Sequence, residues 1–311
     1  MSAVKVRATS LERQLSSSLA KYGNQVEVIT GEELEKTGHT DVNQALQMVA
    51  PGIYSAPKNG RADYTNISIQ GGRQEDVLWL LDGVRFNNRL FSTTTILDSI
   101  SVHMIERIEI LKGGQGLFYG TQAVSGDNNI ITKDPKSSTG GEYGVGLGTL
   151  GDRSLQGHVT GSVTENTNVL VFGNHDESDG FRPFKADAYE TTATITDRSF
   201  ERTNVGVKIE HSFDTGQRLD LHLQHNNVKA DFARPFNQFQ NALNDRDQTI
   251  LSAKWEQRVS NRFSYFVKAY YHDWWTDFTR VGINDTGTLT NINNDDEWGF
   301  EDYGANAMLQ Y

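Results

Sequence analysis

From about Gly140 to the end of the chain, apolar and polar side chains alternate with a period of two, and helix signals nearly vanish. Val205, Val207 and Ile209 alternate with polar or small residues, and the same pattern recurs at 219–224 and 263–271. A period of two is that of β-strands, whose successive side chains point to opposite faces of a sheet. The second half is therefore expected to form strands with one apolar and one polar face.

The links between these strands alternate in length. Eight strand segments are expected, at residues 142–151, 154–163, 168–177, 202–213, 217–230, 247–259, 262–278 and 297–311. Short links alternate with long polar stretches at 178–201, 231–246 and 279–296, and only the short link at 151–153 departs from this order. Short turns at one end and long loops at the other are typical of an outer-membrane β-barrel. A soluble β-sandwich would show the same strand pattern, so that pattern leaves both folds open.

The first 135 residues mix helix and strand signals. Thr30 and Glu33 have the spacing of a capping box, which predicts a short helix from about residue 32. A second helix is expected over 41–49, where apolar residues share one face before Pro51.

Apolar stretches in the same half predict strands at 67–69, 77–81 and 105–111. Asp82 and Gly83 follow the second stretch and tolerate the positive φ of a tight hairpin turn. The first half is therefore expected to be a small α+β domain.

Composition excludes several classes of protein. The chain has 311 residues, 36% of them hydrophobic, a net charge of -11 and no cysteine. No window approaches the roughly 18 apolar residues of a spanning helix, and a chain without cysteine holds neither a disulfide nor a thiolate metal site. Its acidic balance argues against nucleic-acid partners, which require a basic face. Residues 1–10 lack the apolar stretch of a secretory signal, so none is expected in this chain.

A series of short motifs runs in one order through the first half. They lie at residues 26–30, 51–53, 67–71, 80–84, 105–113, 119–120 and 129–133. In this order and spacing they resemble the plug domain of the TonB-dependent outer-membrane receptors. Gln70 stands where that family usually has Arg, Gly114 where it has Pro, and Asp127-Asn128 where it has Gly-Val.

The resemblance implies an α+β plug domain followed by antiparallel β-barrel strands. It assigns residues 1–24 to a flexible N-terminal segment, 25–135 to the plug and 136–311 to a partial transmembrane barrel. Family barrels have about 22 strands, whereas the residues after 135 suffice for about eight, too few to close around a plug. The chain is expected to be the first part of a longer receptor, with an incomplete barrel.

The resemblance also implies a function. A receptor of this family resides in the cell outer membrane, contacts its lipid and takes up a scarce nutrient such as a ferric siderophore, haem or cobalamin. It is a transporter and not an enzyme, with no catalytic residue, cofactor or metal site. Its inner-membrane partner, the TonB complex, pairs with an extended N-terminal segment as an added strand. The candidate segment is Val4, Lys5, Val6, Arg7 and Ala8. A soluble or surface β-rich binding module without transport activity remains the alternative.

Two groups of residues are candidates for contacts in such a receptor. The ligand candidates offer donors, cations and aromatic faces in links that follow or precede strands; they are Arg61, Tyr64, Asn87, Asn88, Arg89, Phe91, Phe181 and Arg182. The second group is a dense charge cluster on an apolar strand, which the family resemblance places against the barrel wall. It consists of Glu106, Arg107, Glu109 and Lys112.

Overall fold

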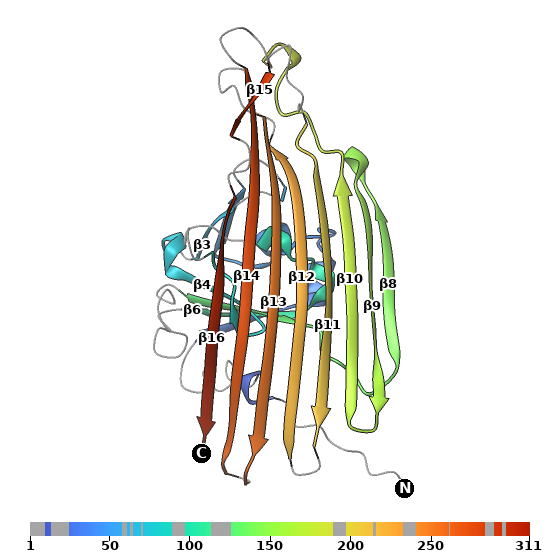
Figure 1. Cartoon of the computed structure of the whole chain (residues 1–311), viewed down its shortest axis with the longest axis vertical. Coiled ribbons are helices and arrows are strands. Elements are labelled where there is room, and N and C mark those ends of the chain that lie inside the picture. The colour runs from blue at the N-terminus through green and yellow to red at the C-terminus, as the bar shows by residue number, and fades with distance from the viewer. Residues whose placement is uncertain are drawn as a thin grey trace.

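The chain forms two parts, an α+β unit of elements β1 to β7 and one long sheet of strands β8 to β16. The computed structural model describes residues 10–13, 25–57, 61–62, 65–69, 71–88, 97–112, 126–188, 197–213, 216–232, 241–260, 262–283, 289–293 and 297–311. The α+β unit lies behind the long sheet in Figure 1, against one of its faces.

Both predicted helices are present, and the first begins at the cap that the sequence indicates. Helix α2 (Gly31–Glu35) follows strand β1 (Gln25–Thr30), and α3 (Val42–Val49) follows within a few residues. The Glu33 backbone N–H donates to Thr30 Oγ1 at 3.2 Å, and the Thr30 N–H donates to the Glu33 carboxylate at 2.8 Å. This reciprocal capping box satisfies two backbone donors that a helix start leaves open.

A five-stranded sheet forms the centre of the α+β unit. Its order is β1-β6-β7-β4-β5, and all pairs are antiparallel except β4 with β7. The strands besides β1 are β4 (Val77–Leu81), β5 (Val84–Arg85), β6 (Ile105–Lys112) and β7 (Gly126–Thr132). Asp82 and Gly83 turn between β4 and β5 with φ of 48° and 75°, as a tight hairpin requires. The predicted strands and the predicted turn are therefore confirmed.

Shorter elements complete this unit. β2 (Ile53–Pro57) and β3 (Thr65–Ile69) form a separate antiparallel pair. Three short 3₁₀ turns are η1 (Gln74–Asp76), η2 (Leu97–Ser99) and η3 (Val102–Met104). The apolar core joins α2 and α3 to the five-stranded sheet and extends to Leu170, Ile250 and Trp274 of the long sheet. The two parts thus share one core.

The long sheet is antiparallel throughout. Its strands are β8 (Gly140–Leu147), β9 (Arg153–Thr164), β10 (Thr167–Ser178), β11 (Phe200–Ser212), β12 (Gln217–Phe232), β13 (Asn241–Arg258), β14 (Ser264–Ile283), β15 (Leu289–Asn293) and β16 (Trp298–Gln310). Its long-loop side also carries η4 (Thr149–Gly151) and η5 (Ala186–Ala188). β15 and β16 both pair with β14, at different places along it, so the sheet has eight strand positions. Eight positions confirm the predicted number, and the sheet is not closed into a barrel.

Strands run further toward the long-loop end than the sequence pattern predicts. β13 begins at Asn241 instead of about 247, and β14 continues to Ile283 instead of about 278. Residues 241–246 do not alternate between apolar and polar side chains, and they still pair with β14 through the backbone ladder. Alternation of side chains marks only the part of a strand with two different faces, whereas backbone pairing continues beyond it.

The two faces of the long sheet are opposite in character to those of a soluble sandwich. Across its middle, one row of neighbouring residues on the outer face is apolar: Val159, Val171, Val207, Leu223, Leu251, Tyr271 and Tyr303. On the inner face, polar side chains are buried against the α+β unit, among them Asn204, Lys208, Gln224, Arg246, Gln248 and Lys268. A sandwich buries its apolar face, whereas a barrel wall turns it outward. The structure therefore excludes the sandwich.

Among the described residues, no helix combines the length and the apolar character needed to cross a bilayer.

Candidate functional site

A buried ion pair and a charged hydrogen bond fasten the α+β unit to strands β13 and β11. Arg246 of β13 donates to the Asp98 carboxylate at 2.5 Å, and both side chains are almost fully buried. Arg202 of β11 binds Asp176 of β10 at 2.8 Å and also donates to the Asp98 backbone carbonyl at 3.0 Å. Removing one partner from such a pair leaves a buried charge without compensation, so these contacts hold the unit firmly.

A ladder of amides continues this interface across four strands. Asn204 of β11 donates to the Ser99 carbonyl of the α+β unit at 2.7 Å and to Asn226 of β12 at 2.9 Å. Asn226 donates to Gln248 of β13 at 3.0 Å, and Gln248 lies 2.8 Å from a ring nitrogen of His272 on β14. Hydrogen-bonded polar groups of this kind stabilise a specific arrangement, because each would be costly to bury alone.

Asp82, in the β4–β5 hairpin, is the centre of a second charged cluster. Its carboxylate lies 3.0 Å from the Lys208 ammonium of β11 and accepts from the Thr132 hydroxyl at 2.6 Å. Burial opposes ionisation of Asp82, but Lys208, followed by His222, Arg13 and the Thr132 hydroxyl, outweighs it and holds the pKa of Asp82 well below the usual range. Lys268 of β14 donates to the Asp82 backbone carbonyl at 2.5 Å. The hairpin is thus bound to the sheet by both side chain and backbone.

Residues 10–13 lie in the same charged cluster. The Glu12 carboxylate contacts the ammonium groups of Lys254, at 3.3 Å, and Lys268. Burial opposes its ionisation, but Lys268 and Lys254 together lower the pKa of Glu12. The Ser10 hydroxyl donates to Glu256 of β13 at 2.9 Å. The segment that directly follows residues 4–8 is therefore anchored to strands β13 and β14.

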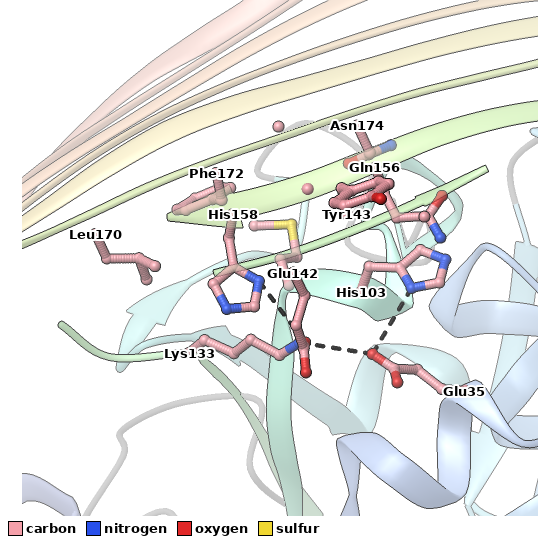
Figure 2. Close-up of a pocket in the computed structure, with 14 residues that line it drawn as sticks. Glu35, His103, Lys133, Glu142, Tyr143, Gln156, His158, Leu170, Phe172 and Asn174 are labelled. Atoms are coloured by element: carbon pink, nitrogen blue, oxygen red, sulfur yellow. Dashed lines mark hydrogen bonds and ion pairs between the residues drawn. The ribbon is translucent and has the colours of Figure 1, made fainter. Parts of the chain in front are cut away.

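A cavity of about 380 Å³ lies between the α+β unit and strands β8 to β10. Figure 2 shows Glu35, His103 and Lys133 facing Glu142 and His158 across it. Lys133 joins the two sides, at 3.6 Å from Glu35 and 3.5 Å from Glu142. The described residues contain no group of three or more His, Asp or Glu side chains placed to hold a metal ion. In this cavity Lys133 occupies the position between the two carboxylates.

The predicted ligand residues fall into three sets: those outside the described residues, those at the long-loop end and those buried at the hairpin. Tyr64, Arg89 and Phe91 lie outside the described residues, as does the candidate TonB-contacting stretch 4–8. Phe181 is partly exposed, and Arg182 pairs with Asp197 at 3.5 Å.

Arg61 lies at the long-loop end of the interface. It pairs with Asp152 at 2.6 Å, and its guanidinium lies 4.4 Å from the centre of the Phe200 ring. Asn87 instead accepts from the Trp79 N–H at 2.7 Å and donates to the Val77 carbonyl at 3.0 Å, fully buried. In this structure its side chain supports the hairpin and is not available to a ligand; Asn88 is equally buried.

The predicted cluster for contact with the barrel pairs elsewhere in the structure. Arg107 binds Glu109 at 2.7 Å and Glu106 at 3.0 Å, and Lys112 binds Glu27 of β1 at 2.8 Å. Glu106 also accepts from Arg13 at 3.0 Å. In the part of the chain that the structure describes, these ion pairs join residues of the N-terminal half, because β6 lies next to β1 and β7 and not beside the long sheet.

Apart from Arg61, the charged residues that bind the two parts together most closely are ones that sequence reasoning missed. They are Glu12, Asp82 and Asp98 on one side and Arg202, Lys208, Arg246, Lys254 and Lys268 on the other. The cations had a signal, since charged residues at inward positions of a strand with an apolar outer face require buried partners. The acids had none, because their positions depend on how the two parts dock.

Asp127 is a buried acid at the start of β7, its second residue. Its side chain is fully buried, and neither carboxyl oxygen has a hydrogen-bond partner among the described residues. Burial, and then the charge of Glu109, raise the pKa of Asp127 well above its usual value. Strand β7 nevertheless pairs normally with β4 and β6, so the altered position does not interrupt the sheet.

Asp127→Asn is expected to stabilise the protein increasingly as pH rises. The carboxyl of Asp127 loses its proton near pH 4 in the unfolded chain, whereas in the folded protein it keeps the proton to higher pH. As pH rises from the unfolded pKa to the folded pKa, Asp127 therefore lowers the free energy of unfolding more and more. Urea unfolding of both forms at pH 5 and pH 8 measures the effect. The gap should widen by at most about 1.4 kcal/mol per pH unit. A gap independent of pH would show that Asp127 is ionised in the folded protein.

Comparison with known proteins agrees with this architecture. Residues 18–126 match the profile described as the TonB-dependent Receptor Plug Domain. The chain is 30% identical over 178 residues to the vitamin B12 transporter BtuB of Vibrio vulnificus (strain CMCP6), covering 57% of this chain and 28% of that protein.

Solved structures show the same fold. The siderophore receptor PirA of Acinetobacter baumannii matches 97% of this chain and 46% of its own, with a TM-score of 0.74 and 18% identity. A mutant of the ferric enterobactin receptor PfeA of Pseudomonas aeruginosa, in complex with enterobactin, matches 90% of this chain and 46% of its own, with a TM-score of 0.69 and 18% identity. The chain thus spans less than half the length of these relatives, which are a transporter and receptors, not enzymes. Residues 18–126 thus match the plug domain of the TonB-dependent receptors, and the chain has the fold of such a plug followed by strands of a barrel wall.

Proposed function

We propose that this chain is part of an outer-membrane receptor that imports a metal chelate or a cobalamin with energy supplied through TonB. The apolar outer face and buried polar inner face of the long sheet carry this proposal, because such a wall requires lipid outside and a polar plug inside. The printed names of the relatives point in the same direction: one transports vitamin B12 and others receive siderophores. The domain boundaries at residues 24 and 135 stay part of the proposal.

The N-terminal segment is the proposed contact with TonB. Val4, Lys5, Val6, Arg7 and Ala8 alternate as an extended strand does, so a partner strand could bind their backbone whatever the side chains. The anchored residues 10–13 follow at once, in contact with β13 and β14. A pull on this segment would therefore be transmitted first to Glu12 and then to the hairpin at Asp82, which share Lys268.

The ligand is proposed to bind at the long-loop end. Arg61 and Arg182 supply cations there, and Phe181 supplies a partly exposed aromatic face. Tyr64, Arg89 and Phe91 belong to the same proposal. Guanidinium and aromatic groups together suit a polar chelate with anionic or aromatic groups. The cluster Glu106, Arg107, Glu109 and Lys112 is proposed to stiffen the plug, with any contact to the barrel lying beyond the strands described.

Uptake by whole cells tests the proposed function. Cells that lack the receptor gene, with and without the intact receptor supplied on a plasmid, are given ⁵⁵Fe-enterobactin and ⁵⁷Co-cyanocobalamin in parallel. We expect the plasmid to restore accumulation of one of the two labels, and removal of TonB to abolish that accumulation. If neither label accumulates, or if accumulation continues without TonB, the proposal is wrong.

A further inference from the structure

Two links of the plug contain the plug residues that are proposed to bind the ligand. The first link, residues 58–64 between β2 and β3, contains Arg61. The second link, residues 86–96 between β5 and η2, contains Arg89 and Phe91. A ligand that contacts both links binds more tightly when their relative position is fixed beforehand, because less conformational freedom is lost on binding. The residues that fix the two links therefore influence the affinity.

Arg246 of β13 is bound to both links where they meet the wall. Its Nη2 group donates to the Ala62 carbonyl, inside the first link, and to the Asp98 carboxylate, two residues after the second link, both at 2.5 Å. Nη2 carries two N–H groups, so it binds both acceptors at once. The side chains of Arg246 and Asp98 are 2% and 3% exposed, and Ala62 is also buried. One buried side chain of the wall therefore joins the two links.

The backbone of Ala62 depends on contacts with the wall. Ala62 has a φ of 58°, in the left-handed region that a residue with a Cβ atom disfavours. Its methyl group packs in a small apolar cluster with Phe200, Val228 and Ala230 of β11 and β12. The guanidinium of Arg61, one residue before, lies over the same Phe200 ring. Without the bond from Arg246 to the Ala62 carbonyl, Arg61 would lose part of the support for its position.

The supporting side chains form one row across the wall. They are Arg246 of β13, Val228 of β12, Arg202 of β11 and Asp176 of β10, successive partners in the strand ladder and all buried. Arg202 adds a hydrogen bond to the backbone carbonyl of Asp98 at 3.0 Å. The contact between Asp82 and Lys208 lies six residues further along β11, or roughly 20 Å away. The row can therefore be altered without touching the hairpin cluster.

We propose that Arg246 is a positioning residue for ligand binding, which through Ala62 and Asp98 keeps the two links of the plug in the relative position that the ligand requires. The inference rests on the proposed function, since it takes the long-loop end as the ligand site, and it adds the wall residue that shapes this site. Because Arg246 is itself buried, it acts through the links and not by touching the ligand.

Equilibrium binding to cells at 0 °C tests this role. Arg246→Met removes the bond to the Ala62 carbonyl, and Asp98→Leu in the same chain removes the carboxylate that would otherwise stay buried without a cation. For the label that the intact receptor binds, ⁵⁵Fe-enterobactin or ⁵⁷Co-cyanocobalamin, this double variant should raise the Kd at least 10-fold. The Kd does not depend on how many receptors reach the membrane. Arg246→Gln, whose side chain is too short for both contacts, replaces the double variant if that variant is not assembled.

Lys208→Met is the matched control. It also removes a wall cation from a buried acid of the plug, Asp82, but it lies away from both links. We expect it to lower the free energy of unfolding and to leave the Kd within 2-fold, whereas the double variant should retain stability and lose affinity. A structural role alone would make affinity follow stability in both. An unchanged Kd in the double variant, or an equal rise in the control, overturns the proposal.

Amide hydrogen exchange of the purified intact receptor tests the positioning without any ligand. In the double variant, the peptides that contain Ala62 and Asp98 should exchange at least 10-fold faster than in the parent, and the peptide that contains Asp82 should not change. Lys208→Met should show the reverse. Equal exchange at Ala62 in the parent and the double variant overturns the positioning. If the parent binds neither label while this contrast holds, the proposed function fails and the fixing of the links by Arg246 stands.

Discussion

Deletion of residues 2–9 from the intact receptor should abolish uptake, lowering its rate at least 100-fold, while binding of the same label to the cell surface stays within 2-fold. The segment holds the alternating stretch 4–8 and ends just before residues 10–13, which are anchored to β13 and β14. Without the stretch, TonB has no strand to bind, but the plug, its hairpin and the long-loop end keep their contacts. Initial uptake and binding at 0 °C, measured in parallel with ⁵⁵Fe-enterobactin and ⁵⁷Co-cyanocobalamin, separate the two effects.

A pair of single substitutions provides the control for this deletion. Val6→Pro removes a backbone N–H that strand addition needs, whereas Val6→Thr retains it and also retains a β-branched side chain. Uptake should fall steeply in the first variant and stay near that of the parent in the second. Undiminished uptake in the deletion would remove the role assigned to residues 4–8.

Asp98→Ala should destabilise docking of the plug by about 3–5 kcal/mol, the cost typical of breaking a buried ion pair on one side. Arg246 would keep its hydrogen bond to the Ala62 carbonyl but lose the carboxylate at 2.5 Å, at a position where its own side chain is 2% exposed. Arg246→Met combined with Asp98→Leu should recover most of the loss, since it removes both charges and retains volume. Urea unfolding of the purified receptor in detergent, followed by tryptophan fluorescence, measures all three.

An exposed ion pair of the same plug serves as the reference. Arg73 pairs with Asp76 at 2.8 Å on the surface, with an arginine side chain 72% exposed. Arg73→Ala should therefore change stability by at most about 1 kcal/mol. If Asp98→Ala costs no more than Arg73→Ala, the buried pair does not hold the plug.

Much of the fold could be predicted from local patterns. The capping box at Thr30 and Glu33, the Asp82-Gly83 turn and the eight strand positions depend on residues close in sequence, and the structure contains all of them. The alternation of apolar and polar residues also predicts a barrel wall. A strand with one apolar face and one face that includes Lys208 or Arg246 has few environments that suit both faces. Only the structure shows which face of the long sheet packs against the α+β unit.

The docking of the two parts could not be predicted in the same way. The dense cluster at residues 106–112 was expected to meet the wall, yet isolated Asp82 and Asp98 make those contacts. Charge density along the chain does not determine which residues face another unit, because that depends on how the two parts dock. Asn87 illustrates the same limit, since an amide after a strand can serve the backbone as well as a ligand.

Contact of the outer face with lipid is the claim on which the account depends, and spin labels on β13 test it directly. Leu251 is 46% exposed on the outer face, and its neighbour Ile250 is fully buried on the inner one. A nitroxide is attached to Leu251→Cys or Ile250→Cys in the intact receptor in liposomes, and its collisions with oxygen and with a water-soluble nickel chelate are compared. We expect the label at 251 to collide often with oxygen and hardly at all with the nickel chelate, as in a bilayer. Frequent collisions with the nickel chelate at 251, or protection from both reagents, would contradict this expectation.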